Sequence, residues 1–369
     1  MKSELKIKRN EPDSSGLVIQ IAIINWNGIN DTTECIDSLL RMDNKVLFEA
    51  YILDNGSDNN EYEKLKVKYS KNPYIKILHS QNNLGFTHGN LLLYEKIKTT
   101  KESSPYIALL NNDTIVTENW LSSLYEFAEK GKWDIVSSKM IKYYDRLKID
   151  NLGHDMLRSG EIIPMNHNEA LNSTPRAISK KSNIQNFGAC GGAAFYRISM
   201  LDKIGFFDPH FETGYEDAEL GFRAFVSGYT LGISTESIVY HKGGVSIKKI
   251  FDTDYAIRVQ RDILYTINKL YPTALKLLSN FSAKLRCITL KTLSYLFNKP
   301  NLRKIVINSR ILYYANDHES IIKPANNQHN ISSFKLYLSQ KPNFYYNIIR
   351  VINYILLNGD SSLERYSNN

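Results

Sequence analysis

Apolar runs of strand length recur along the first third of the chain, and each one stops at a polar loop. Residues 17–26 (LVIQIAIINW) and 46–54 (VLFEAYILD) are the longest of these runs. Two shorter runs, 75–78 (IKIL) and 106–110 (YIALL), end in the same way. Stretches with helical periodicity follow the four runs, at 31–42, 61–70, 88–98 and 118–130.

Strands that alternate with helices predict an α/β fold, in which a mostly parallel sheet carries helices on both faces. The first helix is expected to open at Asp31, where Asp and Thr side chains can cap its N-terminus. Sheets of this kind bind ligands at the carboxyl ends of their strands. The polar loops are therefore expected to face the functional site.

The middle of the chain has a looser pattern. Between 133 and 186 it indicates a strand, a hairpin and a polar connection, which we interpret as a variable or mobile insert. Order returns at 187 with a glycine-rich strand and a short helix. A helix over 216–229 and a strand with its loop over 230–244 are expected to follow.

The chain after about residue 250 is expected to be helical. Over 274–296, apolar side chains recur on one helical face and basic side chains on the other. A helix docked on its own domain or on a dimer partner is the simpler interpretation, and a helix on a membrane surface is the alternative. The apolar positions are Ala274, Leu278, Phe281, Leu285, Ile288 and Leu296, and the basic ones are Lys276, Lys284, Arg286 and Lys291.

Length and composition bound the architecture. A chain of 369 residues can form one large domain with an appendage, or two domains. We expect a polar N-terminal lead (1–16), an α/β domain (17–250) and a basic, mainly helical C-terminal region (251–369). Apolar residues at 43% and charged residues at 23% exclude disordered, collagen-like and coiled-coil chains.

The formal net charge of +8 belongs to the C-terminal region. Residues 251–369 contain 16 Lys and Arg against 7 Asp and Glu, a net of +9, so residues 1–250, with 30 against 31, carry −1. This imbalance favours an anionic membrane surface or nucleic acid as partner, although a solvated lysine-rich face gives the same count. No nucleic-acid-binding motif accompanies it, so we expect no nucleic acid.

Cysteine usage and the N-terminus indicate the compartment. Cys35, Cys190 and Cys287 follow no metal-ligand or redox spacing, and their odd number argues against a disulfide framework. Residues 1–16 lack the apolar core of a signal peptide, and no apolar run reaches the length of a membrane span. Both features predict a cytoplasmic protein.

Asn and Asp side chains follow all four of the first strands. Both residue types are common turn formers, but their repetition at every strand end indicates a binding rim. The loop after the first strand (NWNGIND) lacks the glycine-rich phosphate turn of dinucleotide-binding enzymes, and a Walker A loop is absent too. The side chains are Asn25 and Asn27, then Asp54, Asn55 and Asp58, then Asn82 and Asn83, and finally Asn111, Asn112 and Asp113.

These strand ends resemble those of glycosyltransferase family 2. The segments IINWNG, ILDNGSDNN, QNNLGFTHGN and LLNNDTIVTENWL occur in the family's order, followed by GACGGAAFYR, FETGYEDAELGFRA and IVYHKGG. The resemblance covers about residues 18–250, and its nearest branch is similar to rhamnosyltransferases. It implies a GT-A fold, a nucleotide-diphosphate-sugar donor and inversion at the anomeric carbon.

The branch favours dTDP-rhamnose as donor and leaves UDP-hexose and UDP-N-acetylhexosamine open. A hydroxyl of a glycan, or of a lipid-linked glycan, is the implied acceptor, in the assembly of a bacterial surface polysaccharide. The enzyme would then be peripheral on the inner face of the cell membrane, held there by its basic C-terminal region. A homo-oligomer also stays open, because the apolar C-terminal face could bury against a second copy.

The resemblance places a metal site at Asn111, Asn112 and Asp113, where the family has an Asp-x-Asp motif. Because Asn111 replaces the first Asp, binding of Mn²⁺ or Mg²⁺ should be weaker, and metal independence stays open. His241 resembles a histidine that completes this site in some members and favours Mn²⁺, with a hydrogen bond to the diphosphate as the alternative. Lys242 beside it would offset phosphate charge. An Asx turn is the structural alternative for the motif.

Inverting transfer needs a base that takes the proton of the acceptor hydroxyl. The resemblance assigns this role to Asp217 and acceptor binding to Glu216, and the helix dipole favours the ionised carboxylate there. Helix capping by two acids is the alternative. Gly191 and Gly192 would allow close approach near the sugar and the acceptor, unless they only serve a tightly packed strand bend.

The remaining residues implied by the resemblance would bind the donor. Asp54 resembles the carboxylate that contacts the pyrimidine or the ribose, and Gly85 would let the backbone approach the nucleotide. The substitution at Asn111 also supports a second interpretation, in which a degenerate member binds a sugar nucleotide or glycan without turnover. The expected donor-binding residues are Asn25, Asn27, Asp54, Asn83, Gly85, Asn90, Asn112 and Lys242.

Overall fold

The computed structural model describes most of the chain between residues 17 and 315. The expected N-terminal lead, 1–16, lies outside the described residues, and so does 316–369. The described ranges are 17–43, 45–100, 104–156, 162–172, 186–243, 253–296, 298 and 300–315.

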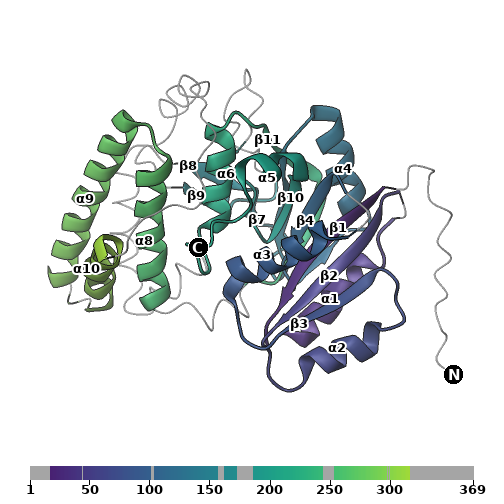
Figure 1. Cartoon of the computed structure of the whole chain (residues 1–369). Helices are drawn as coiled ribbons and strands as arrows, with labels where there is room; N and C mark the ends of the chain where they lie inside the picture. The colour runs from purple at the N-terminus through teal and green to yellow at the C-terminus, as the bar shows by residue number, and fades with distance from the viewer. Residues whose placement is uncertain are drawn as a thin grey trace.

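One large mixed sheet forms the centre of the molecule (Figure 1). Its strands are β1 (Val18–Asn25), β2 (Leu47–Asn55), β3 (Ile75–Ser80), β4 (Tyr106–Leu110), β5 (Thr114–Val116), β6 (Ile135–Lys142), β7 (Ile149–Asn151), β10 (Ala193–Arg197) and β11 (Leu231–His241). They lie in the order β3-β2-β1-β4-β10-β6-β11-β5, and β7 pairs with β6. β5, β7 and β10 run antiparallel to their neighbours, and the other pairs are parallel.

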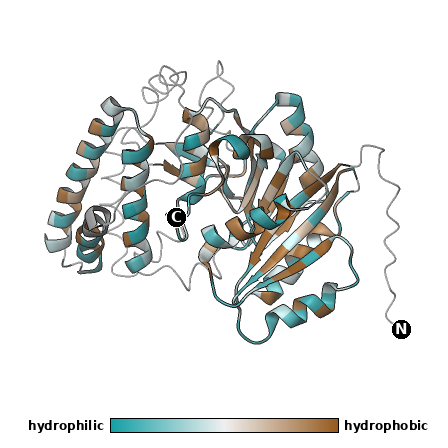
Figure 2. Ribbon diagram, in the orientation of Figure 1, coloured by the Kyte–Doolittle hydropathy of each residue, from teal (hydrophilic) through white to brown (hydrophobic). Residues whose placement is uncertain are grey.

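Helices cover both faces of this sheet, as the alternating pattern predicts. They are α1 (Ile29–Leu39), α2 (Glu61–Tyr69), α3 (Gly85–Lys98), α4 (Trp120–Gly131), α5 (Ile198–Ile204) and α6 (Glu216–Val226). Leu93 of α3 and Phe222 of α6 belong to one buried cluster, whereas Ile36 of α1 and Leu124 of α4 belong to another. Figure 2 shows the central strands as largely hydrophobic, which fits a sheet that is buried on both sides.

The start of α1 differs from the expectation. The helix begins at Ile29, with Gly28 as its N-cap residue and no side-chain capping bond. Thr32 lies inside the helix, and its hydroxyl donates to Asn25 Oδ1 over 2.6 Å. The prediction of Asp and Thr caps at Asp31 is therefore wrong, because the threonine instead bonds the end of β1.

The expected hairpin after β6 is confirmed by the antiparallel pairing of β6 with β7. A separate two-stranded sheet follows, made of β8 (His154–Met156) and β9 (Ile162–Pro164). Much of the predicted mobile insert, at 157–161 and 173–185, lies outside the described residues. What is described of this stretch brings β7 and β8 to the site.

The described part of the C-terminal region, 253–315, is helical as predicted, with α8 (Thr253–Leu270), α9 (Thr273–Leu296) and α10 (Pro300–Ala315) in a layer beside α6 (Figure 1). The rest of the predicted region, 316–369, lies outside the described residues. The expectation that the apolar face of α9 docks on its own domain is wrong for the side chains described. Phe281, Ile288 and Leu296 on that face are exposed. No helix in the described part of the chain combines the length and the apolar character needed to cross a membrane.

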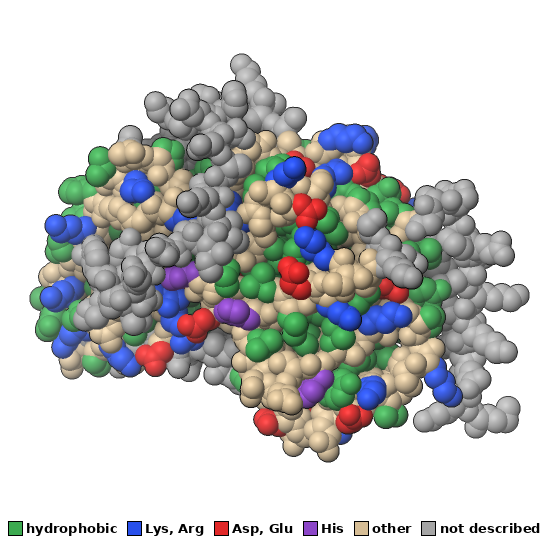
Figure 3. All heavy atoms as spheres, viewed as in Figure 1, with side chains coloured by type: hydrophobic (Ala, Val, Ile, Leu, Met, Phe, Trp, Pro, Cys, Tyr) green, Lys and Arg blue, Asp and Glu red, His purple; other side chains and the backbone are tan. Residues whose placement is uncertain are grey.

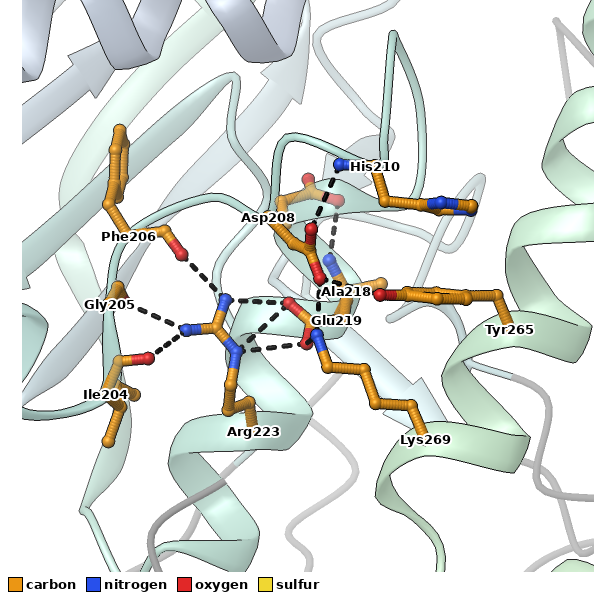
Figure 4. Close-up of polar contacts among 11 residues, drawn as sticks. Ile204, Gly205, Phe206, Asp208, His210, Ala218, Glu219, Arg223, Tyr265 and Lys269 are labelled. Atoms are coloured by element: carbon orange, nitrogen blue, oxygen red, sulfur yellow. Dashed lines mark hydrogen bonds and ion pairs between the residues drawn. The ribbon is translucent and has the colours of Figure 1, made fainter. Parts of the chain in front are cut away.

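A buried polar network fixes α8 to α6 (Figure 4). Lys269 Nζ contacts Glu219 Oε1 at 3.0 Å and Asp208 Oδ2, which also accepts a hydrogen bond from the Tyr265 hydroxyl (2.9 Å). Arg223 Nη2 lies 2.7 Å from Glu219 Oε2, and its guanidinium donates to backbone carbonyls of the loop after α5. Removing one partner of such a buried pair costs about 3–5 kcal/mol, because the other charge is left uncompensated. The predicted boundary at residue 250 stays a prediction.

Candidate active site

The carboxyl ends of the first four strands meet at one edge of the sheet, together with the start of β10. Because β10 runs antiparallel to β4, Ala193 pairs with Leu110 at this edge. The backbone N–H of Asn111 donates to the carbonyl of Gly192 over 2.9 Å. The two glycines therefore lie beside the Asn111–Asp113 segment, as their assignment to one site requires.

Asp217 stands at the same edge, at the N-terminus of α6. Its Oδ2 accepts a hydrogen bond from the N–H of Gly191 (2.7 Å), and its Oδ1 accepts one from the N–H of Ala218 (2.8 Å). His154 of β8 brings its Nε2 to 3.5 Å from Oδ2. The carboxylate is thus held from three sides, and a small part of it stays accessible.

Glu216 and Asp217 are neighbours in sequence but differ in protonation. Burial alone would raise the pKa of Asp217, but His154 and the N–H groups of Gly191 and Ala218 bring that pKa below its ordinary value. Burial, followed by the charge of Asp217, raises the pKa of Glu216 to about 8. At neutral pH the pair therefore holds one proton, on Glu216, and Asp217 is ionised and able to accept another.

A second cluster forms around His241, at the end of β11. Its Nε2 lies 3.2 Å from Asp113 Oδ1, and its Nδ1 lies 2.8 Å from Oδ2 of Asp150 in β7. Burial alone would lower the pKa of His241, but Asp113 and Asp150 raise it well above the usual value. The imidazole is therefore protonated when only these two carboxylates surround it.

The donor set at Asp113 and His241 suits a divalent cation. A carboxylate oxygen and an imidazole nitrogen are ligand types that Mn²⁺ accepts, and Asp150 orients His241 as carboxylates orient metal-binding histidines. Within the described structure the buried Nε2 meets Asp113 as an ion pair, at 3.2 Å, without the geometry of a hydrogen bond. No group of three or more His, Cys, Asp and Glu side chains in the described ranges is arranged to hold a metal. Oxygens of a bound diphosphate would have to complete the coordination.

The two glycines have little room around them. A Cβ added to Gly192 would lie 3.0 Å from Met140 Cε and 3.2 Å from the side-chain nitrogen of Asn111, which places the Asn111 amide against this backbone. A Cβ added to Gly191 would lie 3.2 Å from the ring of Phe86. Close approach of a ligand and a tightly packed strand bend both fit this crowding, so the acceptor role of the glycines stays a prediction.

Two of the expected donor-binding residues are joined to each other below the rim. Asn25 and Asp54 are fully buried, and Asn25 Nδ2 donates to Asp54 Oδ1 and to Glu61 Oε2, both over 2.9 Å. Asp54 Oδ2 also lies 3.1 Å from Nδ1 of His79, whose ring stacks on Tyr62 with centroids 4.7 Å apart. The more exposed His79 and Tyr62, which sequence reasoning missed, form the outer surface of this cluster.

The other expected donor residues shape the loops of the rim. Asn27 Oδ1 accepts from the N–H of Asp58 (2.7 Å), and Asn83 Oδ1 accepts from the N–H of Gly85 (2.8 Å). Gly85 has φ +73°, and a Cβ there would lie 2.9 Å from the carbonyl oxygen of Glu212, so only glycine fits. Two further amides act in the same way: Asn90 donates to Phe86 O and Asn112 to Thr32 Oγ1, both over 2.9 Å.

Lys242 is already matched by acidic partners. Its Nζ lies 2.7 Å from Asp31 Oδ1 and 2.8 Å from Glu34 Oε2, and these hydrogen bonds contribute to its raised pKa. Its backbone N–H donates to the carbonyl of Asp113 over 2.9 Å. The side chain thus anchors the end of β11 to α1, and its contact with a phosphate stays a prediction.

Besides His79 and Tyr62, sequence reasoning missed three residues near Asp217 and His241. Asp150 and His154 come from β7 and β8, in the stretch with the loosest pattern, where no periodicity marks a buried polar side chain. Tyr255 comes from α8, beyond the resemblance, and burial together with Glu216 and Asp217 raises its pKa. The sequence offered no direct signal for these residues. The nearest one is the glycine-rich Cys190–Gly192 turn, in which the N–H of Gly191 binds Asp217.

Comparison with known proteins agrees with this architecture. The family model described as glycosyl transferase family 2 matches residues 20–205, just over half of the chain. Chondroitin synthase of Pasteurella multocida (strain Pm70) is 28% identical over 258 residues, which cover 62% of this chain and 25% of that protein. The chain therefore spans about a quarter of the length of this relative.

One solved structure supports the fold. The crystal structure of GalNAc-T7 with UDP, GalNAc and Mn²⁺ matches at a TM-score of 0.56 and 14% identity, covering 92% of this chain and 58% of that one. That of S. aureus TarS 1-349 matches at a TM-score of 0.48 and 15% identity, covering 70% of this chain and 68% of that one. The fold is GT-A, with a C-terminal helical region. By its family match, this chain belongs to glycosyl transferase family 2.

Proposed function

We propose that this protein is an inverting glycosyltransferase that moves a sugar from a nucleotide diphosphate to a hydroxyl of a glycan acceptor. dTDP-rhamnose is the favoured donor, ahead of a UDP-hexose or a UDP-N-acetylhexosamine, and the setting is bacterial surface polysaccharide assembly. Family membership supports the nucleotide-sugar donor. The choice of sugar rests on the resemblance of the strand ends alone.

One arrangement supports this proposal most strongly. Two consecutive glycines connect the candidate base to the candidate diphosphate site: the N–H of Gly191 binds Asp217, and the carbonyl of Gly192 accepts from Asn111. The ionised carboxylate of Asp217 and the first residue of the Asn111–Asp113 segment thus contact two consecutive residues without side chains. A sugar held over these two residues would have a base on one side and its leaving group on the other.

The reaction follows from the two protonation states. Asp217 takes the proton of the acceptor hydroxyl as the acceptor oxygen forms a bond to the anomeric carbon. The bond from that carbon to the diphosphate oxygen breaks on the opposite face, and its electron pair leaves with the nucleoside diphosphate. Glu216, which is protonated, would donate a hydrogen bond to the acceptor and so orient its hydroxyl towards Asp217.

Negative charge gathers on the leaving diphosphate and has to be offset. A Mn²⁺ or Mg²⁺ ion, when bound, would supply this positive charge, and Asp113 and His241 are the residues that would hold it. Protonated His241 places a positive charge at the same location without a metal. Because Asn111 replaces a carboxylate, metal-independent transfer stays within the proposal.

The acceptor would be a lipid-linked glycan at the inner face of the cell membrane, with the protein bound there as a peripheral cytoplasmic enzyme. The charge of the C-terminal region supports this location.

A donor screen tests the function. The purified chain is mixed with each nucleotide sugar, with and without Mn²⁺ or Mg²⁺, and its melting temperature is measured, since a ligand of the native state stabilises it by mass action. The proposal expects one donor to raise the melting temperature and to release nucleoside diphosphate on incubation. A donor that raises it without any release, even with glycan acceptors present, would favour the degenerate binder instead.

A further inference from the structure

Helix α9 presents an apolar face to the outside of the protein. Its large apolar side chains there are between 40% and 73% exposed, whereas Ser279, Ala283 and Ser294 on the opposite face are buried. Through this opposite face α9 packs on α8 and α10, and Asn280 Nδ2 donates to Asn268 Oδ1 of α8 over 3.0 Å. The exposed side chains are Leu277, Phe281, Leu285, Ile288, Tyr295 and Leu296, here called the α9 stripe.

The charged residues within α9 all have one sign. Lys284 and Lys291 follow Leu277 at steps of seven residues, which is close to two helical turns, so these exposed lysines border the stripe along one edge. Figure 3 shows hydrophobic and basic side chains side by side at the left, over α9. The sequence contains nine Lys and Arg and no Asp or Glu from Ile263 to Asn316.

This charge pattern favours one of the two partners that could cover the α9 stripe, a second copy of the chain or an anionic bilayer. A second copy placed symmetrically on it would bring the same basic segment against the first, and like charges in a desolvated interface oppose association. An anionic bilayer surface offers the complementary charge, and its acyl boundary accepts apolar side chains. A helix of 24 residues is about 36 Å long, so the stripe can lie flat on such a surface.

We propose that the α9 stripe is a docking surface for an anionic membrane. Phe281 and Ile288 enter the headgroup and acyl boundary, and Lys284 and Lys291 contact the lipid phosphates. This inference deepens the proposed function, because it would bring the active site to a lipid-linked acceptor. Vesicle binding is nevertheless measured without donor or acceptor, so the two ideas can fail separately.

The test is sedimentation of the full chain with vesicles of phosphatidylcholine alone, or mixed with an equal amount of phosphatidylglycerol. The wild-type chain should sediment with the anionic vesicles only, and less so as salt is raised. Phe281→Gln combined with Ile288→Gln should lower the vesicle partition coefficient at least about tenfold, as should Lys284→Glu combined with Lys291→Glu. Val67→Gln, at an exposed apolar position on α2, is the matched control and should bind like wild type.

Three outcomes would overturn the proposal. The first is that the wild-type chain does not bind anionic vesicles. The second is that the stripe variants bind these vesicles as well as wild type does. The third is that a stripe variant converts a dimer to a monomer in light scattering while its vesicle binding is unchanged. Since all substituted positions are exposed, the variants should melt at the wild-type temperature. Donor hydrolysis, assayed separately with the same protein preparations, shows whether the proposed activity holds.

Discussion

Two clusters of carboxylate and histidine stand at the same edge of the sheet, and they differ in balance of charge. His241 lies between two carboxylates, 3.2 Å from Asp113 and 2.8 Å from Asp150. His154 approaches the single carboxylate of Asp217 at 3.5 Å, and backbone N–H groups supply the other contacts of that carboxylate. The first cluster has a surplus of negative charge, and the second has one carboxylate stabilised by dipoles.

This difference suits the two clusters to different tasks. A surplus of carboxylate favours a bound cation or a protonated imidazole, either of which can offset a leaving diphosphate. His154 and two N–H dipoles keep Asp217 ionised without a bound metal ion, while Glu216 beside it keeps a proton. Carboxylates and a histidine at one end of the site would thus hold the positive charge that offsets the leaving diphosphate, and the same residue types at the other end would accept the proton of the acceptor hydroxyl.

Asp217→Asn should cause the largest loss of sugar-transfer activity, because it removes the proton acceptor of the second cluster. The amide cannot take a proton, so the rate of sugar transfer should fall about a thousandfold or more. A single-turnover assay of sugar transfer measures this rate. Asp202→Asn, at an exposed carboxylate paired with Lys98, is the control and should be unaffected. Wild-type transfer by Asp217→Asn would remove the residue from the role of base.

Asp113→Ala should have the next largest effect. Loss of the carboxylate leaves the leaving-group charge poorly offset, so kcat should fall about a hundredfold, and stimulation by Mn²⁺ should disappear. Steady-state rates with and without EDTA measure both changes. An enzyme indifferent both to this substitution and to EDTA would mean that cationic side chains alone offset the charge.

His154→Gln should move the pH profile with a smaller loss of rate. Without the nearby imidazole the pKa of Asp217 should rise, and because Asp217 has to be ionised, the acidic limb of kcat/KM should shift to higher pH. The profile of exposed His88→Gln should coincide with that of wild type. An unshifted acidic limb in His154→Gln would show that the backbone N–H groups alone set this pKa.

Glu216→Gln should have the smallest effect, on stability. The pKa of Glu216 is raised to about 8, so the folded state gains stability from its proton below the ordinary carboxyl pKa and loses that gain as pH rises through about 8. The free energy of unfolding of the variant minus that of wild type should therefore be larger above about pH 8 than in mild acid, by at least about 1 kcal/mol. Denaturant titrations at both pH values measure this. A difference that does not depend on pH would contradict the raised pKa.

Much of this fold could be predicted from the pattern of the chain, because buried strands and covering helices impose their own periodicities. β1 to β4 and the helices after them lie where the apolar runs place them. The polar strand ends also meet, since parallel strands bring their carboxyl ends to one edge. Asp113 was proposed from this pattern, whereas His241 and Asp217 were proposed from the family resemblance, and the roles of all three stay predictions.

The partners of these residues could not be predicted. Asp150 and His154 reach the site through short strands, and Lys242 is matched by two acids of α1, about 210 positions earlier. Such contacts depend on tertiary packing, which leaves no local period in the sequence. The apolar face of α9 was recognised from the sequence, but its exposure was not, because an amphipathic pattern shows that such a face exists and not which surface covers it.

The most direct test of the two-cluster account is donor affinity, measured by calorimetry with Mn²⁺ for both Asp113→Ala and Asp217→Asn. The account predicts that Asp113→Ala weakens donor binding strongly, whereas Asp217→Asn binds the donor as wild type does while transferring almost none of it. Loss of donor affinity in Asp217→Asn would contradict the account, because that residue would then belong to the donor site or to the structure rather than act as the base.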